Sequence, residues 1–322
     1  MKGDTIIRRV YDLLMSLVQS VQPDVRYRQD ILQVLERAQA QEDARTSFTQ
    51  LPVLACVAGG GEAAEAIPVA AAWRSLHMAA YLLDGVQDGD MPDASTATLA
   101  RATNVATGLS ALANLALLRT PASARHTLYE DFQKTVLRTA GGQHVDVMLT
   151  GPPDLDTYFR LVGLKSGEPF ALAVRSGGIV AGVSASVIDR YTTFGYNVGI
   201  LMQMMDDWLD FTSSSSGGHG YPLPVVYACT VASPEEAAFL RDAWHHRDGR
   251  SLEMRERVER LGGHAYVMGE IARYTERALS ALEGIEHPDV LRDWLLRVMG
   301  ALHTNPAAAL DFDQTALANS TR

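Results

Sequence analysis

The stretch from Phe194 to Phe211 reads FGYNVGILMQMMDDWLDF and combines an apolar helical pattern with three carboxylates. Its apolar side chains recur at the three- and four-residue spacing of an α-helix. Asp206 and Asp210 are four residues apart, so a helix places both on one face, with Asp207 next to Asp206. Carboxylates amid so much apolar surface need a partner, and no Lys or Arg lies in these turns. A divalent cation with oxygen ligands, such as Mg²⁺, meets this need.

A second acidic cluster ends another apolar helical pattern, in the sequence YLLDGVQDGD that begins at Tyr81. Asp84 and Asp88 are again four residues apart, and Asp90 follows. Asp is common at helix ends, so either cluster alone is also compatible with a solvated terminus. Two clusters at C-terminal helix ends, where the helix macrodipole disfavours anions, favour metal binding instead.

The helical period returns along the whole chain, and no segment shows the alternation typical of a strand. Clusters of Gly, Pro and Ser separate the helical segments, for example at Gly59–Gly61 and at Gly141 with Gly142. The segment Phe170–Val187 is rich in Ala and Gly, which is typical of a central helix. We predict an all-α bundle, with residues 1–322 as a single domain and a flexible loop at residues 212–220. The clearest helical periods lie in residues 6–17, 96–118, 124–149, 188–211 and 264–283.

The composition limits the partners of the chain. Of its 322 residues 47% are hydrophobic, and 38 acidic against 28 basic side chains give a net charge of −10, which disfavours nucleic acid and anionic lipid. The N-terminal segment lacks a signal-peptide core, and no apolar run approaches the ~20 residues that span a bilayer. Cys56 and Cys229 each lie in an apolar stretch, as reduced core thiols do. We therefore expect a cytoplasmic protein without stable membrane insertion.

The helix at 194–211 resembles the FGxxxGxxxQxxDDxxDF helix of the trans-isoprenyl diphosphate synthases (polyprenyl synthetases) and of class I terpene synthases with the same fold. Gln203, Asp206, Asp207 and Asp210 all match this motif. Three more segments match in the family's order, and together the resemblance covers residues 45–230. The matching residues are His77, Asp84 and Asp88 in HxxxLIHDDxxD, Gly142, Gln143 and Asp146 in GQxxD, and Lys165, Ser166 and Phe170 in KTxxLF.

The resemblance implies an isoprenoid-synthase bundle around a deep apolar active-site cavity. It implies three Mg²⁺ ions that bind an allylic isoprenyl diphosphate and stabilise the charge on the leaving diphosphate. It makes Lys165 a direct contact to the diphosphate and Gln203 a residue that orients groups near the carbocation. The metal ligands implied are Asp84 and Asp88 on one side of the cavity mouth, and Asp206, Asp207 and Asp210 on the other.

Further residues are expected to bind the substrate. The small Ala80 and its neighbour Ala79 lie one helical turn before Asp84 and would leave the cavity deep, which in the resembling family goes with a prenyl chain of C15 or longer. Members of this family commonly dimerise, so the resemblance also implies a homodimer. The substrate-binding residues expected besides Lys165 are Gln143, Ala80, Tyr81, Phe170, Arg273 and Tyr274.

The chain departs from the family where a second diphosphate would bind. Gly85 replaces the second Asp of the first motif, and Ser47–Pro52 (SFTQLP) replaces the family's GGKRxRP. Met91–Thr96 (MPDAST) replaces an Arg pair, and His219 stands near an expected Gly-Lys. The retained residues ionise an allylic diphosphate, whereas the missing bases position a second one. We therefore expect a terpene synthase or cyclase, whose carbocation is attacked by its own double bonds or by water.

Two other functions remain compatible with the sequence. The first is a chain-elongating trans-isoprenyl diphosphate synthase whose second-substrate site is rebuilt with other cations, such as Arg45, Arg74 or Arg101. The second is a non-catalytic subunit that partners an active synthase and keeps the fold for packing.

Overall fold

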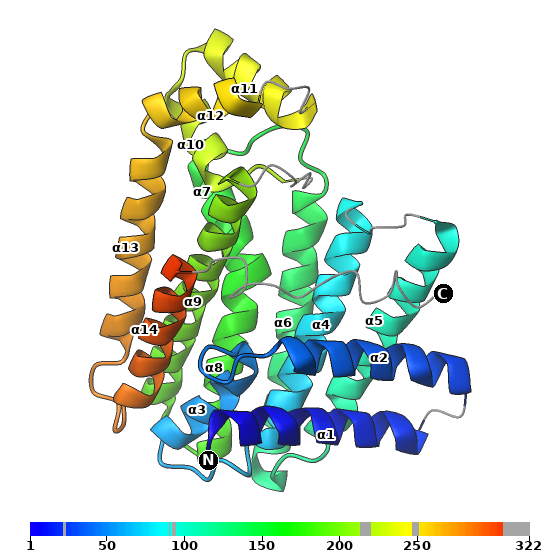
Figure 1. Ribbon diagram of the computed structural model, residues 1–322. Helices are drawn as coiled ribbons and strands as arrows, with labels where there is room; N and C mark the ends of the chain where they lie inside the picture. Colours follow the sequence, from blue (N-terminus) through cyan, green and yellow to red (C-terminus); the bar gives the residue numbers. More distant parts are fainter. Residues whose placement is uncertain (22–23, 90, 92–94, 213–219, 247–250, 305–322) are drawn as a thin grey trace. The chain divides into compact units, whose positions relative to one another are not determined.

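A computed structural model describes the chain except for residues 22–23, 90, 92–94, 213–219, 247–250 and 305–322. Asp90 and residues 213–219 of the predicted flexible loop fall on these gaps, so they lie outside the described residues. Every regular element of the described residues is a helix, which confirms the all-α prediction. The elements are α1 (Gly3–Val21), α2 (Val25–Gln41), η1 (Phe48–Gln50), α3 (Leu51–Ala58), α4 (Ile67–Asp88), α5 (Thr96–Leu117), α6 (Ala122–Asp146), α7 (Leu155–Val162), η2 (Gly163–Gly167), α8 (Glu168–Ala181), α9 (Ala185–Thr212), α10 (Leu223–Val231), α11 (Pro234–His246), α12 (Ser251–Arg260), α13 (Gly263–Ala281) and α14 (Asp289–Thr304) (Figure 1).

The chain divides into two compact units, each built from separate stretches of sequence. The first contains Met1–Lys134, Ala171–Gly195 and Ala281–Arg322, and the second contains Thr135–Phe170 and Tyr196–Ser280. The boundaries lie within helices α6, α8, α9 and α13. The single-domain assignment stays a prediction.

The first unit is built on the antiparallel pair α4 and α5, against which α1 and α2 pack side by side (Figure 1). Trp73 and Leu82 of α4 are fully buried, together with Tyr11 and Leu14 of α1. The hydroxyl of Ser75 donates to the carbonyl oxygen of Leu109 at 2.7 Å and so joins α4 to α5. The apolar stripes read from the sequence therefore form this core.

A buried polar network crosses the first unit. The Nε of Arg74 donates to the hydroxyl of Tyr11 at 2.9 Å and lies 3.2 Å from Oε1 of Glu42. The same carboxylate oxygen accepts from Tyr11 at 2.9 Å and from Thr49 at 2.6 Å. The Arg74 and Glu42 side chains are only 9% and 6% exposed, so each needs the other to offset its burial.

The second unit contains an unusual π-helical segment, η2, between α7 and α8. Asp154 caps α7 by accepting from the backbone N–H of Thr157 at 2.7 Å. Lys165 lies within η2. Single π-helical turns inside helices are frequent at functional sites.

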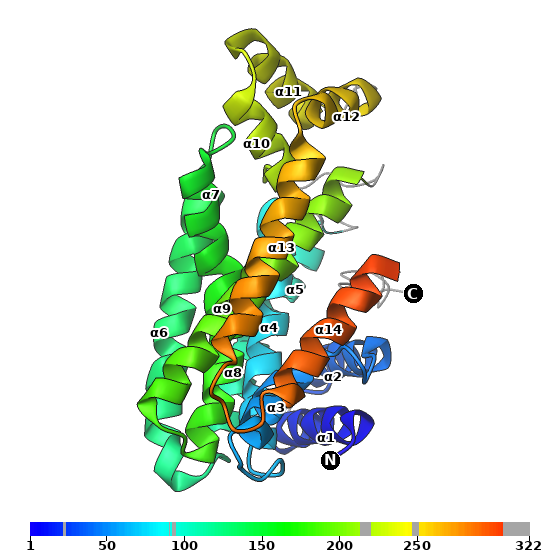
Figure 2. The same ribbon diagram turned by 90° about the vertical axis from the view of Figure 1, so that its left-hand side faces the viewer.

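Other parts of the second unit hold its later helices together. Helices α10, α11 and α12 lie beside one another in Figure 2. The rings of Tyr227 and Tyr266 stack at 4.1 Å, and the indole N–H of Trp244 donates to the carbonyl oxygen of Gly220 at 2.8 Å. The first contact joins α10 to α13, and the second joins α11 to the residue Gly220 that precedes α10.

Two predicted helix boundaries were wrong. Gly141 and Gly142 lie inside α6, where a Cβ on Gly142 would come within 2.7 Å of the Leu164 Cβ, so this glycine permits close packing against η2. The predicted helix at Phe170–Val187 ends instead at Ala181, because Gly182 adopts a left-handed φ of 69°.

Cys56 and Cys229 are free thiols, as predicted, and burial raises the pKa of each to about 11. Within the described part of the chain, none of the helices combines the length and apolarity that crossing a membrane requires.

Candidate functional site

The C-terminal end of α9 carries the second acidic cluster in the second unit. Asp206 is exposed and Asp210 is half-buried, and their four-residue spacing places them on one helix face. Asp207 differs, because it is only 7% exposed. The three adjacent carboxylates therefore have different environments.

Asp207 accepts three hydrogen bonds. Its Oδ2 accepts from the Tyr158 hydroxyl at 2.6 Å and from the Leu223 backbone N–H at 2.7 Å. Its Oδ1 accepts from Nε2 of Gln203 at 3.0 Å. Burial raises the pKa of Asp207, and the hydrogen bonds and the charge of Lys165 oppose that shift.

Gln203 connects this carboxylate to the π-helix. The hydroxyl of Ser166 donates to Oε1 of Gln203 at 2.8 Å, while Nε2 of the same amide donates to Asp207. The π-helical segment packs directly on α9 here, since a Cβ on Gly199 would overlap the carbonyl oxygen of Ser166. The match of Gln203 and Ser166 to the family motifs thus corresponds to a direct contact.

Lys165 faces the end of α6. Its Nζ lies 2.5 Å from Oδ2 of Asp146, and the two side chains are 23% and 25% exposed. On the same helix, both amide atoms of Gln143 and the hydroxyl of Thr139 are buried without a hydrogen-bond partner among the described residues. Because buried polar atoms are normally satisfied, these groups are suited to a ligand or an ordered water.

Tyr274 of α13 is buried and stacks on Phe159 of α7, with ring centroids 5.7 Å apart. The guanidinium carbons of Arg273 and Arg277 lie 5.3 and 5.2 Å from its ring centroid. Arg273 also forms an ion pair with Glu270. The predicted pair Arg273 and Tyr274 is therefore part of a packed aromatic and charged cluster, and its role in substrate binding stays a prediction.

The first acidic cluster belongs to the first unit, at the end of α4. The helical spacing places His77, Tyr81, Asp84 and Asp88 on one face, and the last three are half-buried. Gly85, which stands where the family has an Asp, is buried. Burying a carboxylate at this position would carry a desolvation cost.

His77 is held in one orientation. Its ring stacks on Trp73 with centroids 5.0 Å apart, and its Nδ1 lies 3.3 Å from Nη1 of Arg74. Burial and the charge of Arg74 lower the pKa of His77 to about 3, so the ring is neutral near pH 7. Ala80, expected near the floor of the cavity, is exposed, whereas Met78 and Ala79 are buried. Phe170 of the second unit is buried.

The carboxylate pairs suit Mg²⁺ bound together with a diphosphate. Among the described residues, no group of three His, Cys, Asp or Glu side chains forms a ready metal cluster. Mg²⁺ is usually held by one or two carboxylates together with waters and substrate phosphates, so a complete protein cage is not required. Asp206 with Asp210, and Asp84 with Asp88, each supply two carboxylates on one helix face.

The segment at Ser47–Pro52 forms the short helix η1 and the start of α3. Ser47, Thr49 and Gln50 are buried, and the Ser47 side chain accepts from the Thr49 backbone N–H at the start of η1. The indole N–H of Trp294 donates to the Ser47 carbonyl oxygen at 3.3 Å. The residues that replace the family's bases therefore pack the core.

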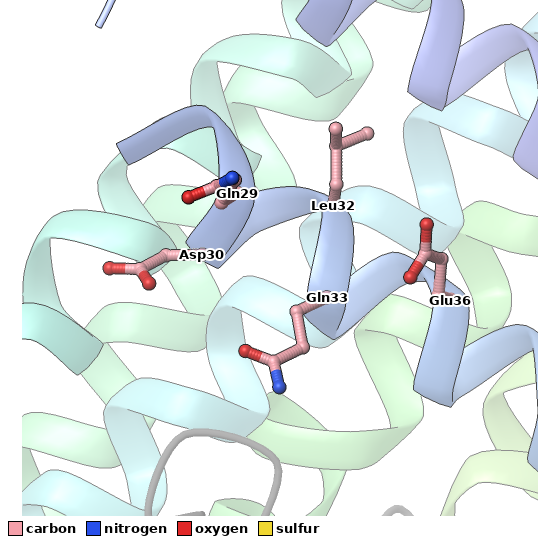
Figure 3. A pocket seen from close by; sticks show the side chains of 5 residues that line it. All are labelled: Gln29, Asp30, Leu32, Gln33 and Glu36. Carbon is pink, nitrogen blue, oxygen red and sulfur yellow. The ribbon is translucent and has the colours of Figure 1, made fainter. Parts of the chain in front are cut away.

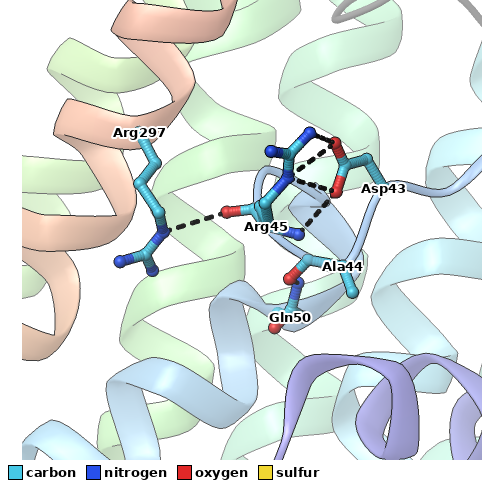
Figure 4. A network of polar contacts seen from close by, with 5 residues as sticks. All are labelled: Asp43, Ala44, Arg45, Gln50 and Arg297. Carbon is cyan, nitrogen blue, oxygen red and sulfur yellow. Dashed lines mark hydrogen bonds and ion pairs between the residues drawn. The ribbon is translucent and has the colours of Figure 1, made fainter.

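The three arginines considered as substitute cations all have carboxylate partners. Arg74 pairs with Glu42 as described, and Arg101 pairs with Asp30 at 2.7 Å. Arg45 pairs with Asp43 at 2.9 Å, and its carbonyl oxygen accepts from Arg297 of α14 at 3.2 Å (Figure 4). Arg45 is the most exposed of the three, with 81% of its side chain accessible.

A surface pocket lies along α2 in the first unit (Figure 3). Its lining is mainly polar, and Asp30 within it already pairs with Arg101. This pocket is thus different from the deep apolar cavity that the resemblance implies. The deep cavity stays a prediction. The lining residues are Gln29, Asp30, Leu32, Gln33 and Glu36.

Tyr158 and Thr139 were absent from the predicted site. Tyr158 contacts a carboxylate 49 residues further along the chain, and no local pattern encodes that contact. Thr139 precedes Gln143 by one helical turn. This spacing places both on one helix face, and it could have indicated Thr139 from the sequence.

Comparisons with known proteins give consistent results. A family model described as "Polyprenyl synthetase" matches residues 42–261. Octaprenyl diphosphate synthase of Escherichia coli K12 is 25% identical over 271 residues, covering 79% of this chain and 82% of the relative. Geranylgeranyl diphosphate synthase of Mycobacterium tuberculosis H37Rv is 26% identical over 263 residues, covering 74% of each chain. A polyprenyl synthase structure from Caulobacter crescentus, complexed with calcium and isoprenyl diphosphate, has a TM-score of 0.74 at 20% identity, covering 98% of this chain and 94% of that one.

Proposed function

Because the chain belongs to the polyprenyl synthetase family, we propose that it is a chain-elongating trans-isoprenyl diphosphate synthase, a prenyltransferase. The observation that carries this proposal is the family match over residues 42–261, which includes both acidic clusters and Lys165. The two relatives named above are both prenyl diphosphate synthases and align over about three quarters of the chain. The comparisons thus favour elongation over the terpene synthase or cyclase that the missing bases had predicted.

The proposed reaction begins with an allylic isoprenyl diphosphate. Asp84 with Asp88, and Asp206 with Asp210, would hold Mg²⁺, and the bound ions would supply positive charge that stabilises the departing diphosphate. Lys165 donates to the same diphosphate, and Asp146 fixes the position of its ammonium. The carbocation then adds to the double bond of isopentenyl diphosphate, and loss of a proton gives the longer prenyl diphosphate.

Other residues are proposed to bind the prenyl substrate. Gln143 supports this role because its amide atoms are buried without a partner among the described residues. Phe170 and Tyr81 supply apolar surface, and the small, buried Ala79 favours a chain of C15 or longer. The relatives are named for products of different length, so they do not narrow this range. A homodimer is also proposed.

A terpene synthase is the second candidate, and a specific observation favours it. The segment at Ser47–Pro52 contains no base and is buried in the core, and Arg45, Arg74 and Arg101 all pair with carboxylates. A protein with this arrangement has lost the family's cations for a second diphosphate. Its product would be a hydrocarbon or alcohol released together with inorganic diphosphate.

Product analysis separates these functions. The purified chain is incubated with Mg²⁺ and geranyl, farnesyl or geranylgeranyl diphosphate, with and without isopentenyl diphosphate, and the products are identified by mass spectrometry. Elongation predicts longer prenyl diphosphates only when isopentenyl diphosphate is present. A hydrocarbon or alcohol formed without it would support the terpene synthase. Absence of any diphosphate release, in the wild type as in Asp206→Ala, would contradict both and indicate a non-catalytic subunit.

A further inference from the structure

Asp207 joins three helices of the second unit. It receives hydrogen bonds from Tyr158 of α7, from Gln203 of α9 and from the first backbone N–H of α10, at Leu223. A carboxylate has about four lone-pair positions, and protein donors occupy three of them here. Two of the three donors converge on the same oxygen, Oδ2, at 2.6 and 2.7 Å.

This arrangement differs from what a Mg²⁺ ligand requires. Mg²⁺ binds oxygen at about 2.0–2.1 Å in an octahedral shell that keeps several waters, so a ligand must present an open oxygen. Asp207 is 7% exposed and its oxygens face protein donors, whereas Asp206 on the same turn is exposed. The two neighbouring carboxylates are therefore suited to different tasks.

The hydrogen bond that Gln203 donates to Asp207 decides which way the Gln203 amide points. Nε2 of Gln203 donates to Oδ1 of Asp207 at 3.0 Å, so the amide turns its NH₂ group toward this carboxylate. Its carbonyl oxygen then faces η2, where it accepts from Ser166 at 2.8 Å. Ser166 is the residue after Lys165. The hydrogen bonds from Asp207 through Gln203 to Ser166 therefore reach the segment that carries the proposed diphosphate contact.

The bond to Leu223 stabilises the start of α10. The first N–H groups of a helix lack partners within it, and a negative charge near them is favourable. Pro222 precedes this helix and provides no side-chain cap. Asp207 supplies the missing acceptor from a position 16 residues earlier in the chain.

We infer that Asp207 is a positioning residue and not a metal ligand: anchored by Tyr158, it orients the Gln203 amide toward Ser166 and holds the start of α10. This inference rests on the proposed function for the role of Lys165. It assigns the metal ligands on α9 to Asp206 and Asp210 alone.

The test compares Asp207→Asn with its neighbour Asp206→Asn, and uses two readouts that need no turnover. Mn²⁺ is titrated in the presence of inorganic diphosphate, and hydrogen exchange of the Leu223 amide is followed by NMR. Asp206→Asn should weaken Mn²⁺ binding by at least about tenfold and leave Leu223 exchange unchanged. Asp207→Asn should change Mn²⁺ binding much less and speed Leu223 exchange by about tenfold, as expected for one lost hydrogen bond.

Tyr158→Phe keeps the test informative if Asp207→Asn does not fold, since it removes a single hydroxyl. It should leave Mn²⁺ affinity unchanged and lower kcat by about tenfold. The double variant Tyr158→Phe with Ser166→Ala should lose less than the product of the two single losses, because both act through Gln203. Mn²⁺ binding weakened as much by Asp207→Asn as by Asp206→Asn, with Leu223 exchange unchanged, would overturn the inference. If no substrate turns over while the Mn²⁺ and exchange results hold, the proposed function fails and the placement of Asp207 stands.

Discussion

The ammonium of Lys165 lies 2.5 Å from the carboxylate of Asp146 and so joins the π-helical segment η2 to the end of α6. Both side chains are about three quarters buried, so the pair holds the lysine in one position more firmly than a surface pair would. The proposed function makes this ammonium a direct contact to the diphosphate. The pair therefore links a helix-packing feature to the chemistry.

Substitutions of this pair should separate charge from position. Lys165→Ala is expected to lower kcat/KM for diphosphate release by about a hundredfold, since it removes a charge that stabilises the leaving group. Asp146→Asn should lower it by about tenfold, because the lysine keeps its charge and loses its fixed position. Lys134→Ala is the matched control, since Lys134 forms an exposed pair with Glu130 on the same helix. Unchanged kinetics in Asp146→Asn would contradict the positioning role.

Removal of one partner from the buried pair Arg74 and Glu42 should destabilise the protein strongly. Glu42→Gln leaves the guanidinium without its counter-charge, and the expected loss in free energy of unfolding is about 3–5 kcal/mol. The exposed pair of Arg45 and Asp43 provides the comparison, and Arg45→Ala should change the same quantity far less. Urea unfolding followed by circular dichroism measures both. Equal effects of the two substitutions would be inconsistent with the buried network.

Glycine substitutions test the close packing of η2 on α9. Gly199→Ala places a Cβ against the Ser166 carbonyl oxygen, and the expected loss in stability is about 1–3 kcal/mol or more. Gly141→Ala is the control in helix α6, since a Cβ there meets no atom within 4 Å. It should stabilise the protein by about 0.5–1 kcal/mol, the usual gain of Ala over Gly in a helix. Thermal unfolding measures the stability of both variants. A Gly199→Ala protein as stable as the wild type would contradict the close contact between Gly199 and Ser166.

His77 should make stability depend on pH. Its pKa falls from 6.5 in the unfolded chain to about 3 in the folded protein, so the unfolded state binds the proton more tightly between these values. The contribution of His77 to stability is thus complete above pH 6.5 and decreases as the pH falls toward 3. Urea unfolding at pH 7.5 and pH 4.5 should show a smaller acid loss in His77→Gln than in the wild type. The same loss of stability in both proteins would show that His77 keeps its ordinary pKa in the folded protein.

Much of the fold could be predicted from the sequence because apolar residues in a long helix recur every three or four positions. The patterns at 96–118 and 188–211 correspond to α5 and α9 within a few residues. The pair Gly141 and Gly142 suggested a break, yet both lie inside α6 because Gly142 packs against Leu164, a contact that no local pattern encodes. Helix ends set by a left-handed glycine, as at Gly182, were equally hard to place.

The sequence singled out the three carboxylates on α9, but it did not show that their environments differ. Asp206, Asp207 and Asp210 look alike in the sequence, and Asp207 is distinguished by its hydrogen bonds from Gln203 and from the distant Tyr158 and Leu223. The missing bases were read correctly from Ser47–Pro52, but the function drawn from them, a terpene synthase, is not the one that the comparisons favour. An absent motif shows what one segment lacks and does not show which other residues perform its task.

Transfer of label from isopentenyl diphosphate tests the central claim most directly. The wild-type chain is incubated with Mg²⁺, an allylic diphosphate of C15 or longer and labelled isopentenyl diphosphate, and the label in longer prenyl diphosphates is counted, with Asp206→Ala as the control. A chain-elongating synthase predicts label in the longer diphosphate that is lost in Asp206→Ala. Consumption of the allylic diphosphate with no label in any product would contradict it.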